Sequence, residues 1–191
     1  MRAGLPVLTF ADADAFASWL ETHGASSAGA WLKFAKKGAP VPTLAKAEAL
    51  DAALCHGWID GQIGRYNAHY WVIRFTARQP ASRWSQINCE RASALMAEGR
   101  MRLEGLDAVA SAKADGRWAG AYAPASRAEP PPDLVEALKA NPKAAAFFAT
   151  LKGANRYALL YRIHAVKKPE TRARKIASYV EMLERGETIH G

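Results

Sequence analysis

The sequence predicts an α+β protein in which a small antiparallel sheet packs with helices, followed by a Pro-rich linker and a small helical C-terminal module. Apolar and polar residues alternate with period two in residues 30–35 and 70–75, which is typical of half-buried strands. After Pro80 the apolar residues recur with helical spacing. Residues 119–133 hold four of the ten prolines and show no periodicity. Together these patterns predict the three parts of the chain.

The Pro-rich segment sets the predicted boundaries, because consecutive prolines favour extended backbone and form semi-rigid linkers. The predicted parts are an α+β N-terminal domain over residues 1–118, the linker over residues 119–133 and the helical module over residues 134–191.

The first predicted helix follows Asp12 or Asp14, either of which can cap it. Phe16, Trp19 and Leu20 fall at i, i+3 and i+4, so they form one apolar face. The next segment alternates and predicts the first strand. A second helix is then predicted between Thr43 and Gly57, on the spacing of its leucines.

Residues 58–75 predict a hairpin whose turn lies near residues 66–68. Gly61 and Gly64 weaken its first strand and indicate a bulge or a close approach. With the earlier strand, this gives a sheet of about three strands.

The remaining elements are predicted to be helical. Ser82 can cap a helix that ends near Gly99, with an inner face formed by Ile87, Arg91, Ala94 and Leu95. Another helix is expected from about Leu103 to Asp115, and three short helices follow the linker, two of them starting at Pro142 and Pro169.

Composition excludes several classes of protein. The chain has 191 residues, half of them hydrophobic, and no apolar run long enough to span a bilayer. No apolar stretch typical of a signal peptide follows Met1, and the two cysteines, Cys55 and Cys89, form no disulfide framework. We therefore expect buried thiols and a cytoplasmic location.

The net charge of +8 is concentrated in two blocks of the chain. Residues 58–102 carry 7 basic and 3 acidic side chains, and residues 151–191 carry 9 and 4. If the blocks share a face, they would attract anions such as nucleic-acid phosphates. Solvated helix surfaces would explain the same numbers without any partner.

The familiar catalytic signatures do not occur in the sequence. It contains no nucleophile elbow, phosphate loop, dinucleotide fingerprint or H-E-x-x-H helix. The five histidines are scattered without metal-ligand spacing, so no metal, cofactor or catalytic residue is predicted. Whether the protein is an enzyme stays open, and the sequence favours a non-enzymatic role.

Aromatic, basic and polar residues gather between positions 58 and 88, as ring stacking and anion binding require. An Asp60–Arg74 contact across the hairpin could hold Arg78 near an anion, and the following helix offers free backbone N–H groups. Capping plus one salt bridge would explain the same residues structurally. The candidate ligand-binding residues are Trp58, Asp60, Arg74, Arg78, Ser82, Trp84, Ser85 and Asn88.

Several stretches resemble the YdeI/OmpD-associated family, also called the bacteriocin-protection or OmdA-like family. They are A-L-C-H-G-W-I-D-G (53–61), R-F-T-A-R-Q-P-A-S-R-W-S-Q-I-N (74–88), G-R-M-R-L-E-G-L (99–106), A-D-G-R-W (114–118) and K-K-P-E-T-R-A-R-K-I (167–176). The resemblance spans nearly the whole chain. It implies a bacterial protein of antimicrobial or stress tolerance, with no agreed enzyme activity.

Three functions follow as hypotheses. The first is a non-enzymatic tolerance protein that binds an anionic small molecule or a peptide through residues 58–88. The second is a nucleic-acid-binding protein that uses the basic blocks 58–102 and 151–191. The third is an enzyme with a site around Asp60, Ser85 and Asn88. The oligomeric state is not predicted.

Overall fold

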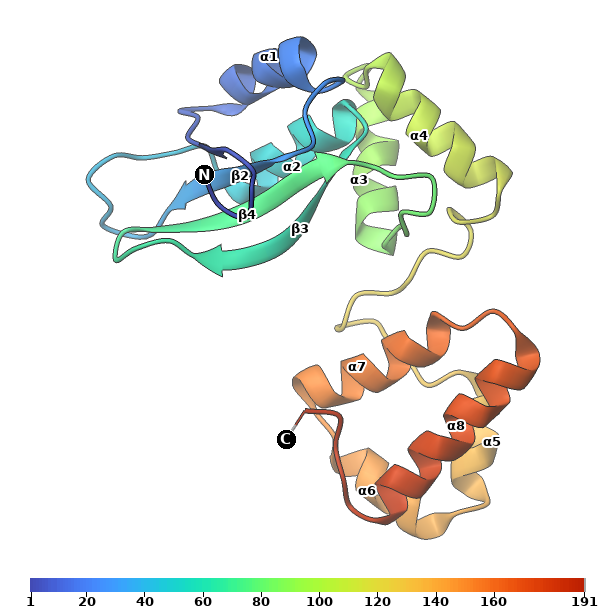
Figure 1. Cartoon of the computed structure of the whole chain (residues 1–191). Coiled ribbons are helices and arrows are strands. Elements are labelled where there is room, and N and C mark those ends of the chain that lie inside the picture. Colours follow the sequence, from blue (N-terminus) through green and yellow to red (C-terminus); the bar gives the residue numbers. More distant parts are fainter. Residues whose placement is uncertain (191) are drawn as a thin grey trace. The chain divides into compact units, whose positions relative to one another are not determined.

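The computed structural model describes residues 1–190 and divides into two compact units, Met1–Ala121 and Tyr122–Gly191 (Figure 1). The predicted α+β class is confirmed, since one mixed sheet and a set of helices make up the chain. The division falls inside residues 119–133, where the sequence predicts a linker.

The first unit contains a four-stranded sheet and four helices. In chain order the elements are β1 (Val7–Leu8), α1 (Ala13–His23), β2 (Ala30–Ala35), α2 (Lys46–Cys55), β3 (Trp58–Arg65), β4 (Tyr70–Ala77), α3 (Gln86–Ala97) and α4 (Leu103–Ala114). The strand order is β1-β2-β4-β3, with β1 parallel to β2 and the other pairs antiparallel. The sequence predicted about three antiparallel strands and missed β1, the parallel strand at the edge of the sheet. β1 has only two residues, which are too few to show an alternation of apolar and polar residues.

The predicted hairpin is confirmed as β3 and β4. Its turn is held by the Asn67 side chain, whose Oδ1 accepts hydrogen bonds from the backbone N–H groups of His69 and Tyr70 at 2.9 Å each. The pairing shifts register between Asp60 and Ile63, so the predicted bulge lies at the glycine-containing part of β3.

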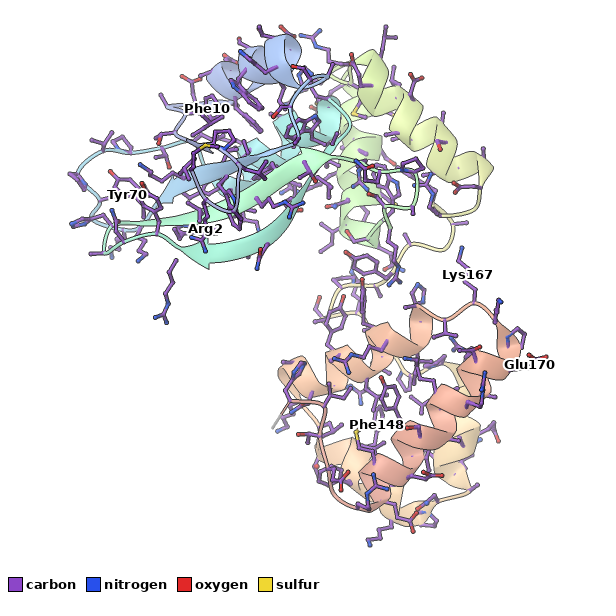
Figure 2. The ribbon with its side chains drawn as sticks, viewed as in Figure 1. Arg2, Phe10, Tyr70, Phe148, Lys167 and Glu170 are labelled. Carbon is purple, nitrogen blue, oxygen red and sulfur yellow. The ribbon has the colours of Figure 1, made fainter. Side chains whose placement is uncertain are left out.

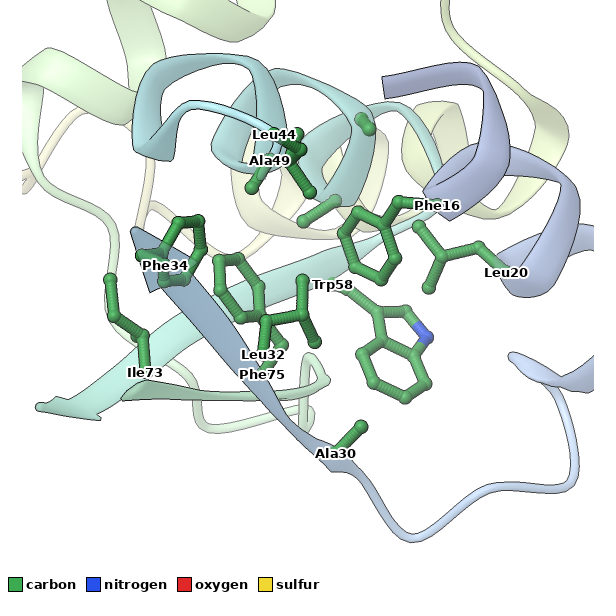
Figure 3. Packing of buried hydrophobic residues seen from close by; sticks show 12 residues of the cluster. Phe16, Leu20, Ala30, Leu32, Phe34, Leu44, Ala49, Trp58, Ile73 and Phe75 are labelled. Atoms are coloured by element: carbon green, nitrogen blue, oxygen red, sulfur yellow. The ribbon is translucent and has the colours of Figure 1, made fainter. Parts of the chain in front are cut away.

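Helices α1 and α2 cover one face of the sheet and build the main core (Figure 3). Phe16 of α1 is fully buried and meets Phe75 of β4 edge to face, with 5.7 Å between ring centroids. Burying an aromatic or branched side chain of this kind contributes roughly 1.5–3 kcal/mol. The alternation of β4 is thereby explained, because Ile73 and Phe75 must face the helices.

Helix α3 begins three residues later than the sequence predicts. Ser85 is the N-cap, and its Oγ accepts a hydrogen bond from the backbone N–H of Asn88 at 3.1 Å. The Ser82 hydroxyl instead accepts from the Gln79 backbone N–H at 2.9 Å and closes the preceding turn. The predicted inner face was wrong for Ile87, which is 40% exposed, and for Ala94, which is also exposed.

Two glycines let α2 and α4 cross at very short distance. Gly57, with φ +71°, ends the turn after α2, and an added Cβ would lie 2.7 Å from the Glu104 carbonyl oxygen. At Gly105 in α4, an added Cβ would lie 2.3 Å from the carbonyl oxygen of Cys55. The crossing is reinforced by the Arg102 backbone N–H, which donates to the same Cys55 oxygen at 2.9 Å. No other residue type fits both positions without moving the helices.

The second unit is a bundle of four helices, α5 (Pro132–Lys139), α6 (Pro142–Thr150), α7 (Gly153–His164) and α8 (Pro169–Glu184), around its own core. The sequence predicts three helices here and misses α7, whose start has no side-chain cap. Arg172 joins α8 to Asp133 of α5 through two hydrogen bonds and also donates to the Ile163 carbonyl at 2.8 Å. Part of the Pro-rich segment belongs to this unit, because Tyr157 donates to the Ala123 carbonyl at 3.2 Å.

Candidate functional site

A cavity of about 660 Å³ lies in the first unit, at the end of the sheet where β4 leaves it. Five segments line it: the C-terminal part of α1, the turn after α2, the end of β4 with the loop after it, α4 and the turn after α4. Its apolar walls come from residues such as Leu20, Trp58 and Leu103. Its ionisable lining residues are Glu21, His56, Arg78, Arg102, Glu104 and Arg117.

The glycine crossing of α2 and α4 positions this lining. Gly57 itself lies in the cavity wall, and its carbonyl oxygen accepts a hydrogen bond from the Arg78 backbone N–H at 2.9 Å. His56 precedes this glycine, while Arg102 and Glu104 flank the start of α4. The charged groups are therefore fixed to backbone that cannot shift without breaking the crossing.

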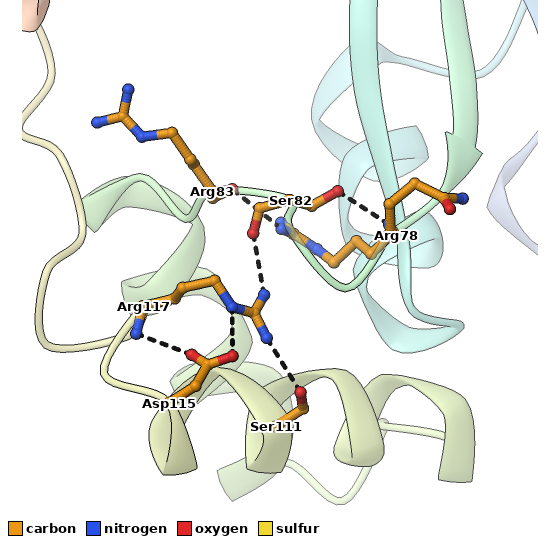
Figure 4. A network of polar contacts seen from close by, with 7 residues as sticks. Arg78, Ser82, Arg83, Ser111, Asp115 and Arg117 are labelled. Carbon is orange, nitrogen blue, oxygen red and sulfur yellow. Dashed lines mark hydrogen bonds and ion pairs between the residues drawn. The ribbon is translucent and has the colours of Figure 1, made fainter. Parts of the chain in front are cut away.

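Arg78 and Arg117 hold the loop between β4 and α3 from two sides (Figure 4). The Arg78 guanidinium lies 3.6 Å from the centroid of the Trp84 ring, and its Nη1 donates to the Arg83 carbonyl at 3.3 Å. Arg117 donates to the Ser82 carbonyl and to the Ser111 hydroxyl, at 3.0 Å each, and pairs with Asp115. Both arginines shape the cavity wall as well as charging it.

Arg102 differs from these two arginines because its side chain is 60% exposed. Its Nη2 donates to Oε1 of Glu21 at 2.8 Å, and the Glu21 side chain is 51% exposed. An ion pair this exposed contributes little stability and is readily exchanged for another anion. Arg102 is thus the lining guanidinium best placed to bind a ligand.

His56 is the buried titratable group of the cavity, with 9% of its surface exposed. Burial lowers the pKa of the imidazole below 6.5, Arg102 lowers it further, and Glu21 and Glu104 act in the opposite direction. The ring is therefore neutral at neutral pH, when it has one donor and one acceptor nitrogen.

Lowering the pH from about 7.5 to about 5.5 should destabilise the first unit in part through His56. The unfolded chain takes up a proton on this ring near its ordinary pKa of 6.5, while the folded protein resists protonation until lower pH. The stability that the neutral His56 contributes is therefore complete above pH 6.5. It is lost as the pH falls from 6.5 toward the lower pKa of the folded protein. Urea unfolding at both pH values should show a smaller loss for His56→Gln than for the wild type. Equal losses would contradict the burial of a neutral ring.

The predicted site residues are only partly brought together. Trp58 and Arg78 line the cavity. Asp60 lies opposite Phe75 on the face that α2 covers, with its Oδ2 4.0 Å from Nζ of Lys46. The predicted Asp60–Arg74 contact was therefore wrong: Arg74 is one position along β4 and points to the other face, and a shift of one residue reverses the face.

The other four predicted residues surround the start of α3 and do not line the cavity. Trp84 is 2% exposed and lies in the core formed by α2, α3 and α4. Ser85 and Asn88 are buried, and the cap between them already occupies the backbone N–H of Asn88. Ser82 serves the loop described above.

Sequence reasoning missed Glu21, His56, Arg102, Glu104 and Arg117. They are spread along the chain and share no motif, so no spacing identifies them. Three of the stretches singled out above, A-L-C-H-G-W-I-D-G, G-R-M-R-L-E-G-L and A-D-G-R-W, contain four of them, all but Glu21, and were the available signal. Within residues 1–190, no three His, Cys, Asp or Glu side chains are grouped to hold a metal ion, and no helix is long and apolar enough to cross a membrane.

Comparison with known families assigns the two units differently. Residues 8–108 match the model of a family described as Domain of unknown function (DUF8412), and residues 127–186 match the family described as Bacteriocin-protection, YdeI or OmpD-Associated. The second resemblance was expected over nearly the whole chain and is found in the C-terminal unit alone, so the candidate residues at 58–88 lie in the DUF8412 match. Searches among curated proteins and among solved structures gave no significant match. The chain therefore belongs to the DUF8412 family, and its C-terminal residues 127–186 are similar to the bacteriocin-protection, YdeI or OmpD-associated family.

Proposed function

We propose that the protein acts in bacteriocin protection or a related stress response by binding a small anionic ligand, such as the carboxylate end of a peptide, in the arginine-lined cavity. The C-terminal family match supports the biological context. The observation that carries the binding role is a cavity of about 660 Å³ lined by three arginines. This volume is within the range of about 300–1,000 Å³ typical of small-molecule sites. The predicted cytoplasmic location stays part of the proposal.

The charges of the lining favour a carboxylate that is attached to an apolar body. Three guanidinium groups face two carboxylates around a neutral His56, so the lining is cationic by one charge. A ligand carboxylate can replace Glu21 at Arg102 as a bidentate acceptor. The apolar walls around Trp58 then accommodate the rest of the ligand. Asp60, Ser85 and Asn88 do not line the cavity, so it lends no support to an enzyme built on them.

Calorimetric titration with N-acetyl-Leu-Leu tests this proposal. The dipeptide should bind the wild type, and its C-terminal amide, which lacks the negative charge, should bind at least tenfold more weakly. Arg102→Ala should weaken the carboxylate form by about tenfold or more, since a hydrogen bond to a charged group contributes roughly 1.5–3 kcal/mol.

Arg100→Ala provides the matched control for Arg102→Ala. Arg100 is also exposed, by 52%, and also pairs with a glutamate, Glu98, but it does not line the cavity. Its removal should leave the affinity unchanged. Equal losses in the two variants, or no preference for the carboxylate over the amide, would refute the proposed site.

A further inference from the structure

The sheet of the first unit has a second face that carries no helix. Both helices that pack on the sheet, α1 and α2, lie on the face of Ile73 and Phe75 (Figure 1). We call the second face the open sheet face. It is formed by the outward-facing side chains of β2 and β4, by Tyr66 of the hairpin turn and by Arg2 of the N-terminal segment. Its exposed or half-buried members are Arg2, Lys33, Tyr66, Tyr70 and Arg74, and beneath them lie Trp31 and Val72, which are buried.

Arg2, labelled in Figure 2, packs on this face against the Trp31 ring. Its Cζ is 4.6 Å from the centroid of the Trp31 ring, and its Nη1 donates to the Arg65 carbonyl at 2.7 Å. An added Cβ at Gly64 would lie 2.3 Å from the Arg2 Nη2, so the guanidinium fills the space that this glycine leaves. A cation is thus fixed across the sheet from β2 to β3.

Two further cations and two tyrosine rings extend the face. Nζ of Lys33 lies 4.7 Å from the centroid of the Tyr66 ring and 5.3 Å from that of Tyr70. Tyr66 is exposed, with 46% of its surface accessible to solvent. The Arg74 side chain is exposed and makes no hydrogen bond or ion pair with the residues that the structure describes. The face therefore presents both positive charge and ring surface to solvent.

No acidic side chain neutralises this face. The four strands of the sheet contain one acidic residue, Asp60, which faces α2 and pairs with Lys46. Residues 1–11, 22–47 and 61–89 contain neither Asp nor Glu. A surface with several cations and no carboxylate is complementary to a polyanion.

We propose that the open sheet face binds single-stranded nucleic acid. Phosphates would contact Arg2, Lys33 and Arg74, and a base would stack on Tyr66, since exposed rings beside cations are the usual platform for single strands. A duplex fits less well, because its bases are stacked inside and its grooves accept a helix or a two-stranded ribbon rather than a broad sheet face. This surface is separate from the cavity, whose lining includes none of these residues.

Fluorescence anisotropy with the full chain and a labelled 15-nucleotide oligothymidylate tests the proposal. Three phosphate contacts predict that the logarithm of the binding constant falls with the logarithm of salt concentration at a slope of about −2. Arg74→Ala should make that slope shallower by about 0.7. Tyr66→Ala should weaken binding about tenfold with the slope unchanged, because it removes a stacking ring and no charge.

The controls distinguish binding at the open sheet face from attraction by the positive charge of the whole protein. Arg100→Ala removes one exposed cation elsewhere in the same unit and should change neither affinity nor slope. A duplex of the same length, heparin and vesicles of phosphatidylserine with phosphatidylcholine compete as alternative partners. The proposal is overturned if the oligothymidylate fails to bind at about 50 mM salt, if any competitor binds as tightly, or if Arg100→Ala and Arg74→Ala act alike.

Discussion

Replacing Trp84 by alanine should lower the free energy of unfolding of the first unit by about 3–5 kcal/mol, the usual cost of truncating a buried large aromatic residue. The ring is 2% exposed and contacts the Trp118 ring, with 4.9 Å between centroids. It also supports the Arg78 guanidinium at 3.6 Å. The substitution therefore removes core volume and the platform of a cavity-wall arginine at once.

Tryptophan fluorescence during urea unfolding measures this effect in the intact chain. All six tryptophans lie in the first unit, so their emission reports this unit without a contribution from the helical one. Trp84→Phe is the control and should cost much less, because it keeps a ring in the core. If Trp84→Ala were as stable as the wild type but failed to bind the dipeptide, Trp84 would be a ligand residue rather than a structural one.

Gly105→Ala should destabilise the first unit by about 3 kcal/mol, even though alanine favours a helix over glycine by about 1 kcal/mol. The added Cβ would lie 2.3 Å from the Cys55 carbonyl oxygen and 2.8 Å from that of Leu54. Both obstacles are backbone atoms, so α2 and α4 must separate. Because the same crossing fixes His56 and Arg102, dipeptide affinity should fall together with stability.

Gly61→Ala is the matched control for the added methyl group. Its Cβ would meet the Arg74 carbonyl at 3.5 Å, which is an ordinary contact. Urea unfolding should therefore show a change within about 0.5 kcal/mol of the wild type. A Gly105→Ala protein as stable as Gly61→Ala would contradict the close crossing of the two helices.

The hairpin shows how far pattern alone carries a prediction. Alternation placed β3 and β4 correctly, because burying Ile73 and Phe75 against helices leaves the intervening residues on the other face. The pairing of Asp60 was wrong by one residue. Alternation within a strand says nothing about which residue of the partner strand lies opposite, and the bulge at Gly61 changes the register along β3.

The candidate site was predictable to a smaller extent. Trp58 and Arg78 lie in residues 58–88, the segment that the sequence analysis singled out. Arg102 and Arg117, at the start of α4 and in the turn after it, also line the cavity but lie outside that segment. Sequence reasoning also gave Trp84 a binding role that its burial does not favour. The many aromatic rings and arginines at residues 58–88 did indicate a part of the cavity lining. Their number alone could not show which of these side chains face solvent.

The sequence by itself determined the class of fold, the hairpin with its turn, the second helical part and the excess of positive charge, because hydrophobic periodicity and composition are local properties of the chain. Tertiary structure alone decided which arginines meet in one cavity and which cations share the open sheet face. Those groupings depend on the crossing at Gly57 and Gly105 and on strand register, which join residues far apart in the chain through backbone contacts that no local pattern encodes.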